Sequence, residues 1–213
     1  MKLFKTITEE RKQRLQSRLR PDPVAWTLWE RALSNCNSNS RQRLTGMYLL
    51  ASEINYSHDA ISSEVYFAHP LRVAALSYLY SNDTDAAIVG LLHNVFEVCA
   101  DDISFLQKKV EPKILTQIES LNVDRTSQWD DGYNHNYFRR LNEGPCSAGL
   151  VKIFDKLDNL FVLGLNPDEK IRQMYTAHFE RYILPMIRVL TPDLVDYAVE
   201  LVVDTRKIGF ISS

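Results

Sequence analysis

The chain has 213 residues, enough for one domain, and its 45% apolar and 24% charged residues are the usual balance of a globular protein. The formal net charge is −2, so the sequence lacks the basic character of a nucleic-acid-binding protein. These numbers exclude a disordered chain and argue against a nucleic-acid partner.

The spacing of apolar residues predicts an all-α fold. Glycine is scarce, with 7 residues, and the strict alternation of apolar and polar residues that indicates strands is hard to find. Apolar residues instead recur about every three or four positions, the period of an amphipathic helix. The predicted helices, in chain order, are residues 22–35, 41–54, 69–80, 83–99, 102–110, 112–121, 134–141, 148–163, 167–190 and 191–208.

Prolines and polar stretches set the expected helix boundaries. Pro70 is predicted at the first helical position of its helix, because proline fits the first turn without loss of a backbone hydrogen bond. Pro185 should end or kink the long helix that precedes it. The polar stretches 35–40, 55–65 and 124–133 are predicted to be loops.

The chain is expected to form one main domain with an appendage. Residues 1–40 are predicted to be an N-terminal helical extension packed on a helical domain of residues 41–213. Trp26 and Trp29, three positions apart, are expected at the seam between the two parts. Residues 166–213 show amphipathic helices and are expected only to cover the bundle.

Cysteine usage and hydropathy predict where the protein resides. Cys36, Cys99 and Cys146 lie far apart and form no C-x-x-C pair, which is typical of reduced thiols rather than of disulfides or a zinc site. Residues 1–20 alternate charged and apolar positions without the apolar core of a signal peptide. No stretch approaches the roughly 20 apolar residues that span a bilayer. We therefore expect a cytoplasmic protein with no membrane partner.

The five histidines differ in their predicted surroundings. His58 and His135 lie in polar stretches and are expected at the surface, whereas His178 is expected to pack within its helix. His69, taken alone, is a helix-boundary residue. His93 lies in the most apolar predicted helix, where an imidazole without a partner would cost about 1–3 kcal/mol. His93 therefore requires hydrogen-bond partners or a metal.

Acidic residues occur in the two most apolar predicted helices. Asp155 and Asp158 interrupt the apolar residues of 148–163, where an unpaired carboxylate is costly. His93 and Glu97, four positions apart, are expected on the same side of their helix. Metal sites in helical bundles gather histidines and carboxylates from several helices in this way. A metal cluster and a set of hydrogen-bonded core residues both fit this spacing.

Three segments stand out in order along the chain: YFAHPLRVA (66–74), AAIVGLLHNVFEV (86–98) and LVKIFDKLDNL (150–160). Together they resemble the signature motifs of the HD-domain hydrolases of the RelA/SpoT type. The family pattern is approximately Y-x-x-H-P, then A-x-L-L-H-D-x-x-E-D, then V-K-x-A-D-(R/K)-L-x-N. The resemblance covers roughly residues 41–165 and implies an all-α, HD-domain helical bundle with extra N-terminal helices.

The resemblance also implies a metal. Family members hold one divalent cation, usually manganese, and the matching positions here are His69, His93, Asn94 and Asp155. Such a cation lowers the pKa of a bound water and polarises a phosphoryl oxygen.

Further positions match the family's residues for chemistry and substrate. Glu97 falls on the carboxylate that positions the attacking water, and Lys156 and Asn159 fall in the substrate-binding part of the third motif. Family members cleave the 3′-pyrophosphate from guanosine alarmones such as ppGpp. The resemblance therefore implies a small, phosphorylated, nucleotide-like ligand.

The sequence departs from the family pattern in four places. Asn94 replaces an aspartate ligand, so the ligand set carries one negative charge fewer and cation affinity should fall. Val98 replaces a carboxylate and cannot accept a proton. Residues 58–64 contain no Lys or Arg where the family is basic, and Phe161–Val162 stand in place of Arg-Thr. The lost cations argue against a polyphosphorylated guanosine ligand.

Two functions remain open from the sequence. The first is a metal-dependent phosphohydrolase of altered or reduced activity, with Glu97 as the water-orienting base. The second is a catalytically inactive HD fold that binds a ligand or a partner protein through the same pocket. The sequence does not predict an oligomeric state.

Overall fold

The computed structural model describes residues 6–16, 22–57, 62–99 and 104–211. These residues form helices and no strand, and Tyr56 and Cys99 make an isolated antiparallel bridge. The predicted all-α class is confirmed. In chain order the helices are α1 (Ile7–Gln16), α2 (Pro23–Ser34), α3 (Ser38–Ser52), α4 (Ser63–Ser81), α5 (Thr84–Leu92), α6 (Val95–Val98), α7 (Ser104–Lys109), α8 (Pro112–Leu121), α9 (Asp131–Glu143), α10 (Cys146–Val162), α11 (Glu169–His178), α12 (Leu184–Leu190) and α13 (Val195–Ile208).

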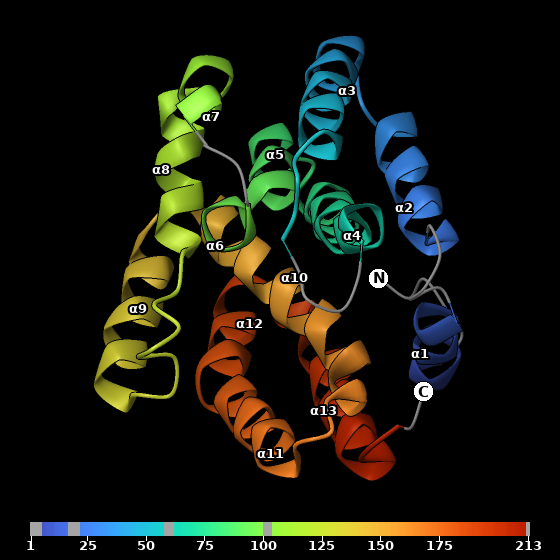
Figure 1. The fold of residues 1–213 in the computed structure, drawn as a ribbon, viewed down its shortest axis with the longest axis vertical. Coiled ribbons are helices and arrows are strands. Elements are labelled where there is room, and N and C mark those ends of the chain that lie inside the picture. The colour runs from blue at the N-terminus through green and yellow to red at the C-terminus, as the bar shows by residue number, and fades with distance from the viewer. Residues whose placement is uncertain (1–5, 17–21, 58–61, 100–103, 212–213) are drawn as a thin grey trace.

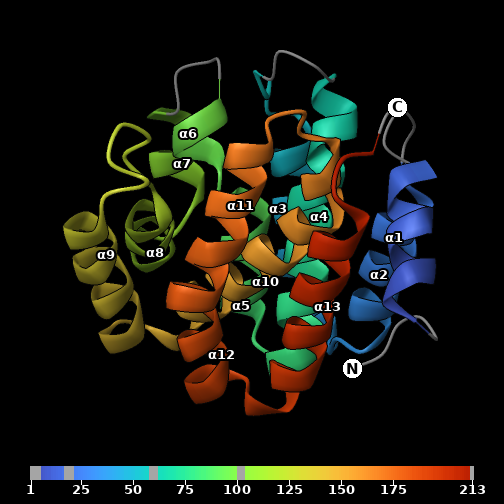
Figure 2. The same cartoon turned by 90° about the horizontal axis from the view of Figure 1, so that it is seen from below.

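Helix α10 lies at the centre of the fold. It contacts α4, α5, α8 and α9 on one side and α12 and α13 on the other (Figure 1). Apolar residues occupy most of its positions, and nearly all of its length from Ala148 to Phe161 is buried. Figure 2 shows α11, α12 and α13 lying over α10. The C-terminal helices cover the bundle, and this part of the expectation is confirmed.

Helices α4 and α5 pack closely because α5 carries a glycine at their contact. A Cβ atom on Gly90 would lie 2.7 Å from the Cα atom of Ala74, closer than two non-bonded carbon atoms can approach. The absent side chain lets the two helices approach and brings the end of α5, where His93 lies, beside α4.

The N-terminal helices are integrated into the core. Helix α2 packs against α4, and α1 packs against α10 and α13. Trp29 is buried and Trp26 is half exposed, and both rings stack on Tyr48 of α3, with centroids 6.0 and 5.4 Å from its ring. Both tryptophans thus pack between the N-terminal helix α2 and helix α3, at the seam where they were expected.

The start of α4 differs from the prediction. The helix begins at Ser63, within the stretch predicted to be a loop, and Pro70 lies buried in its interior. Ser62 accepts a hydrogen bond from the Val65 N–H and so caps the helix well before the proline. His69 consequently lies inside a long helix rather than at a helix N-terminus.

The predicted helix 83–99 is broken into α5 and α6. The Nδ1–H of His93 donates to the Gly90 carbonyl oxygen at 2.7 Å, the acceptor that the Asn94 N–H would use in a continuous helix. The chain turns at Asn94, and α6 starts at Val95. The expectation that His93 and Glu97 share one side of a helix was therefore wrong.

The long C-terminal helix is interrupted before its proline, as predicted. Helix α11 ends at His178, a π-helical turn covers Phe179–Ile183, and α12 carries Pro185 in its first turn. Proline lacks the N–H that would continue the α-helical pattern, so the preceding turn widens. Among the helices that the structure describes, none combines the length and apolar character needed to cross a membrane.

Candidate metal centre

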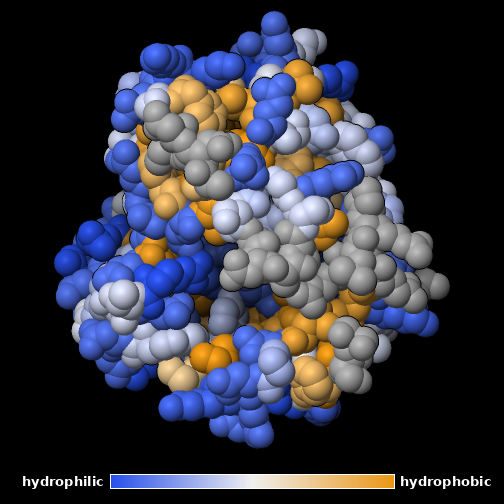
Figure 3. All heavy atoms as spheres, in the orientation of Figure 1, coloured by the Kyte–Doolittle hydropathy of each residue, from blue (hydrophilic) through white to orange (hydrophobic). Residues whose placement is uncertain are grey.

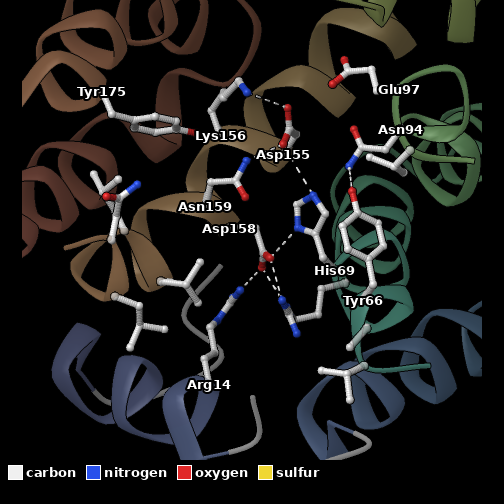
Figure 4. A pocket seen from close by; sticks show the side chains of 18 of the residues that line it. Arg14, Tyr66, His69, Asn94, Glu97, Asp155, Lys156, Asp158, Asn159 and Tyr175 are labelled. Atoms are coloured by element: carbon white, nitrogen blue, oxygen red, sulfur yellow. Dashed lines mark hydrogen bonds and ion pairs between the residues drawn. The ribbon is translucent and has the colours of Figure 1, made fainter. Parts of the chain in front are cut away.

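A cavity of about 650 Å³ opens between α4, α6, α10 and α11. Figure 3 shows a hollow near the middle of this face of the molecule. Six of the seven predicted site residues line the cavity. The seventh, His93, is buried behind His69. The three motif segments therefore meet at one site, although they lie far apart in the sequence (Figure 4).

Three side chains direct one ligand atom each toward a common point. The Nε2 atoms of His69 and His93 are 3.2 Å apart, and they lie 3.5 and 3.9 Å from Oδ1 of Asp155. Donor atoms held about 2.1 Å from one cation lie about 3.0 Å apart at right angles and about 3.4 Å apart at tetrahedral angles. The separations of 3.2 and 3.5 Å are close to this range, and the 3.9 Å between His93 and Asp155 is longer. These side chains form a group that could hold a metal ion.

The other ring nitrogens of both histidines are already engaged. His93 donates from Nδ1 to the Gly90 carbonyl oxygen, and His69 donates from Nδ1 to Oδ2 of Asp158, each at 2.7 Å. Each Nε2 then presents a lone pair to the common point, where Asp155 adds a carboxylate oxygen. A divalent cation or a proton between them would relieve the repulsion of three electron-pair donors that face one another. The hydrogen bonds at both Nδ1 atoms are the pattern usual around metal-bound histidines. These residues therefore fit the divalent cation that the motif resemblance implies.

Burial keeps both imidazoles neutral, the form that binds a metal. It lowers the pKa of His93 to about 3 and also lowers the pKa of His69, against the opposing effect of Asp155. Burial works against ionisation of Asp155 as well, but the ammonium groups of Lys156 and Lys152 outweigh it and hold the pKa of Asp155 well below its usual value. The site thus presents two neutral imidazoles and one carboxylate.

Asn94 lies beside this group of atoms without being engaged in it. Its Nδ2–H donates to the Tyr66 hydroxyl at 2.9 Å. In Figure 4 the amide nitrogen faces Tyr66 on the neighbouring helix α4. Asn94 thus holds the tyrosine at the cavity wall in the structure.

Glu97 lies at the edge of the cavity on α6. Its carboxylate accepts a hydrogen bond from the Val123 N–H at 3.2 Å and forms an ion pair with Arg125. The Glu97 side chain is 7% exposed and that of Arg125 is 62% exposed. Arg125, in the loop between α8 and α9, therefore places a long, exposed cationic side chain at the cavity. The sequence motifs did not indicate this residue.

Lys156 and Asn159 both contact the carboxylate of Asp155. Asn159 donates to Oδ1 at 2.7 Å, and the Lys156 ammonium lies 3.2 Å from Oδ2. The Lys156 ammonium also lies 5.7 Å from the ring centre of Tyr175 on α11. Tyr175 lines the cavity, so the expectation that residues 166–213 only cover the bundle was incomplete.

Neither His135 nor His178 lines the cavity. His135 is exposed, as predicted. His178 packs against Trp129 and Tyr182, with ring centroids 5.9 and 5.0 Å from its own, so the predicted packing role is confirmed. His58 lies outside the described residues.

Asp158 and two arginines are part of the site's surroundings that the motifs did not reveal. Asp158 occupies the variable position of the third motif, and it bonds to Arg72 of α4 and to Arg14 of α1 as well as to His69. The sequence signal was the second carboxylate in an apolar helix. Its partners could not be predicted because Arg14 is 144 positions away in the chain.

Comparison with known proteins gives a distant but consistent likeness. No protein-family profile matches the chain. Guanosine-3′,5′-bis(diphosphate) 3′-pyrophosphohydrolase of Borreliella burgdorferi is 24% identical over 128 residues, which are 57% of this chain and 19% of that protein. The chain thus spans about a fifth of this relative's length.

A solved structure supports the same likeness at the level of fold. It is described as a metazoan orthologue of SpoT that hydrolyses ppGpp and plays a role in starvation responses. The similarity has a TM-score of 0.57 and 18% identity, and it covers 79% of this chain and 97% of that one. The resemblance to HD-domain phosphohydrolases of the RelA/SpoT type is confirmed, and the chain has their all-α fold.

Proposed function

We propose that the protein is a metal-dependent phosphohydrolase related to the guanosine alarmone hydrolases, with an altered or reduced activity on a small phosphorylated, nucleotide-like ligand. The observation that carries the proposal is the convergence of two imidazole Nε2 atoms and one carboxylate oxygen, with both Nδ1–H groups engaged. The likeness to a ppGpp hydrolase structure supports it.

His69, His93 and Asp155 would hold the cation, and Asn94 would adjoin it. Two imidazoles and one carboxylate are a ligand set for a first-row transition metal, and we propose manganese on the strength of the motif resemblance. A bound cation supplies Lewis acidity, which activates a water molecule and polarises a phosphoryl oxygen. The hydrogen bonds from Asn159 and Lys156 fix the orientation of the Asp155 carboxylate.

Glu97 would orient the attacking water and accept its proton. In the structure one of its oxygens is paired with Arg125. An anionic ligand that draws the exposed guanidinium toward its phosphate would free that oxygen. Lys156 and Arg125 together would supply the positive charge that residues 58–64 lack.

Metal content and turnover test this proposal. The purified protein is expected to bind divalent cation in a 1:1 ratio, measured by elemental analysis and Mn²⁺ titration, and His93→Ala should lose it. His135→Ala, which changes an exposed histidine, is the matched control. Phosphate and pyrophosphate release should then be measured with ppGpp and with 5′- and 3′-phosphorylated nucleosides. A protein that binds no divalent cation and gains no activity with Mn²⁺ contradicts the proposal.

The second candidate is a catalytically inactive HD fold that binds a ligand or partner through this cavity. Asn94 favours it, because a neutral amide, whose nitrogen donates to Tyr66, stands at a position where the motif has a carboxylate. Val98, also at the cavity wall, offers no proton acceptor. This function predicts saturable binding of a phosphorylated nucleotide without release of phosphate from it.

We further propose that the protein acts in the cytoplasm and without a nucleic-acid partner. All three cysteines are free thiols, as expected where disulfides do not form. Localisation of a tagged chain by microscopy tests the compartment.

A further inference from the structure

Asp158 lies directly behind the candidate metal centre and bonds to one of its ligands. It is 2% exposed and lies three positions after Asp155 on α10. Its Oδ2 accepts the Nδ1–H of His69 at 2.7 Å. A carboxylate in this position fixes which ring nitrogen carries the proton and makes the opposite nitrogen a stronger electron-pair donor.

Two arginines hold Asp158 in this orientation. Arg72 of α4 binds it with two parallel hydrogen bonds, Nε to Oδ1 at 2.8 Å and Nη2 to Oδ2 at 2.7 Å. Arg14 of α1 contacts the same Oδ1 (Figure 4). A forked arginine–carboxylate pair fixes geometry as well as charge. The Asp158 side chain therefore has little freedom to rotate away from His69.

The network continues into the N-terminal segment of the chain. Arg14 also pairs with Glu10 one turn earlier on α1, and its guanidinium lies 4.1 Å from the ring centre of Phe161. Arg72 pairs with Asp22, whose other oxygen caps α2 by accepting the Val24 N–H at 2.8 Å. The charged groups of this network are all buried.

The charges of this network do not balance by themselves. Two guanidinium groups, those of Arg14 and Arg72, face the three carboxylates of Glu10, Asp22 and Asp158. Counted over the described residues, this network therefore has one negative charge in excess, and its groups are buried, where an uncompensated charge is costly. The hydrogen bond between His69 and Asp158 connects this network to the candidate metal centre.

We propose that Asp158 is a positioning residue for the metal centre and that Arg14 keeps it in place. The N-terminal helix α1 thereby contributes to metal binding. The inference rests on the proposed metal site. It assigns a role to a segment that lies outside all three motifs.

Cation affinity measured across four proteins tests this inference. Mn²⁺ dissociation constants should be measured for the unmodified chain, Asp158→Asn, Arg14→Gln and Arg11→Gln, at a temperature where circular dichroism shows each to be folded. Arg11 is the matched control, since it is equally buried on α1 but bonds to the Leu160 and Phe161 carbonyl oxygens and to Asp204. Asp158→Asn should weaken Mn²⁺ binding about 10- to 100-fold. Arg14→Gln should weaken it about tenfold, and Arg11→Gln should leave it within about twofold of the unmodified chain.

A spectroscopic measurement separates positioning from folding. In the metal-free protein, ¹⁵N chemical shifts should show the His69 proton on Nδ1, and the Arg14→Gln substitution should shift part of the population to Nε2–H. If Asp158→Asn does not fold, Arg14→Gln and this measurement decide the question.

Each outcome is informative. Mn²⁺ binding by the unmodified chain with equal affinity in Asp158→Asn and Arg14→Gln leaves the metal site standing and overturns the positioning role. Equal weakening by Arg11→Gln and Arg14→Gln also overturns it, because docking of α1 alone would then explain the loss. Absence of binding by the unmodified chain overturns the metal site and this inference together.

Discussion

At the scale of single residues, the site depends on which atoms already have partners. His69 and His93 each use Nδ1 for a bond within the protein, which leaves Nε2 for a cation. Asn94 and Glu97 are instead turned to Tyr66 and Arg125. The sequence predicted that the motif residues lie at one site, because three ordered segments matched one family pattern. It did not predict the hydrogen-bond and ion-pair partners of His69, Asn94 and Glu97, because the pattern does not specify which side chains pair with one another.

Restoring the carboxylates of the family pattern should strengthen cation binding. The double substitution Asn94→Asp with Val98→Asp adds negative charge beside His69 and His93, and we expect Mn²⁺ affinity to rise about tenfold. Isothermal titration measures it. Asn142→Asp, at an exposed position on α9, controls for a general charge effect. An affinity equal to that of the control would mean that the side chain at position 94 does not face the cation.

Arg125 should decide how well the cavity binds a phosphorylated ligand. Its guanidinium is 62% exposed and lies beside Glu97, so it can exchange that carboxylate for a phosphate oxygen. Arg125→Gln should raise KM, or the dissociation constant if turnover is absent, about tenfold for phosphorylated nucleotides. Arg139→Gln removes a similarly exposed arginine paired with Glu143 and serves as control. Equal values for the two variants would remove Arg125 from the ligand site.

At the scale of the elements, the helix positions followed from the apolar pattern and the break before α12 followed from Pro185, but the break after Leu92 and the start of α4 did not. The period of apolar residues placed most of the helices. The break after Leu92 arises from one side-chain bond, His93 to the Gly90 carbonyl, and the early start of α4 arises from the Ser62 cap. A single side-chain hydrogen bond determines each of these two helix boundaries. The apolar periodicity, which is averaged over many residues, does not reveal such a bond.

The close packing of α4 on α5 should make Gly90 intolerant of a side chain. In Gly90→Ala the new Cβ would lie 2.7 Å from the Ala74 Cα, so the helices must separate, at a cost of about 1–3 kcal/mol in the free energy of unfolding. Gly46→Ala is the matched control on α3, where among the described residues a Cβ meets open space. The free energy of unfolding of Gly46→Ala should rise by about 0.5–1 kcal/mol, because alanine has a higher helix propensity than glycine. Urea denaturation measures both, and an unchanged midpoint for Gly90→Ala would contradict the packing argument.

At the scale of the whole molecule, the first and the last helix that the structure describes both meet the central helix α10. Helices α1 and α13 both pack on α10, and Arg11 of α1 joins them through the Phe161 carbonyl oxygen and Asp204. The division into an extension of residues 1–40 and a domain of residues 41–213 stays a prediction. Removal of the segment before α3 would test it, and we expect the remainder to lose stability because α2 and α1 bury part of the core.

Acid should destabilise the fold in part through His178. Burial, followed by the charges of Lys156 and Lys152, lowers the pKa of His178 to about 4, whereas in the unfolded chain it is about 6.5. Between these values the unfolded state binds more protons than the folded state, so the free energy of unfolding falls as pH falls through this window. Between about pH 6.5 and pH 4 the free energy of unfolding should fall by on the order of 2 kcal/mol, and above about pH 6.5 this contribution is fully present.

The substitution His178→Phe isolates this effect. Phenylalanine keeps the packing against Trp129 and Tyr182 and does not titrate, so stability should decline less steeply between about pH 6.5 and pH 4 than in the unmodified chain. The measurement is urea denaturation at half-unit pH steps with manganese present throughout, and His135→Asn, an exposed position, serves as control. Parallel stability curves for His178→Phe and the unmodified chain would show that protonation of His178 does not govern the acid response. The decline would then have to come from groups that both proteins share, foremost His93 and His69, whose pKa values burial also lowers.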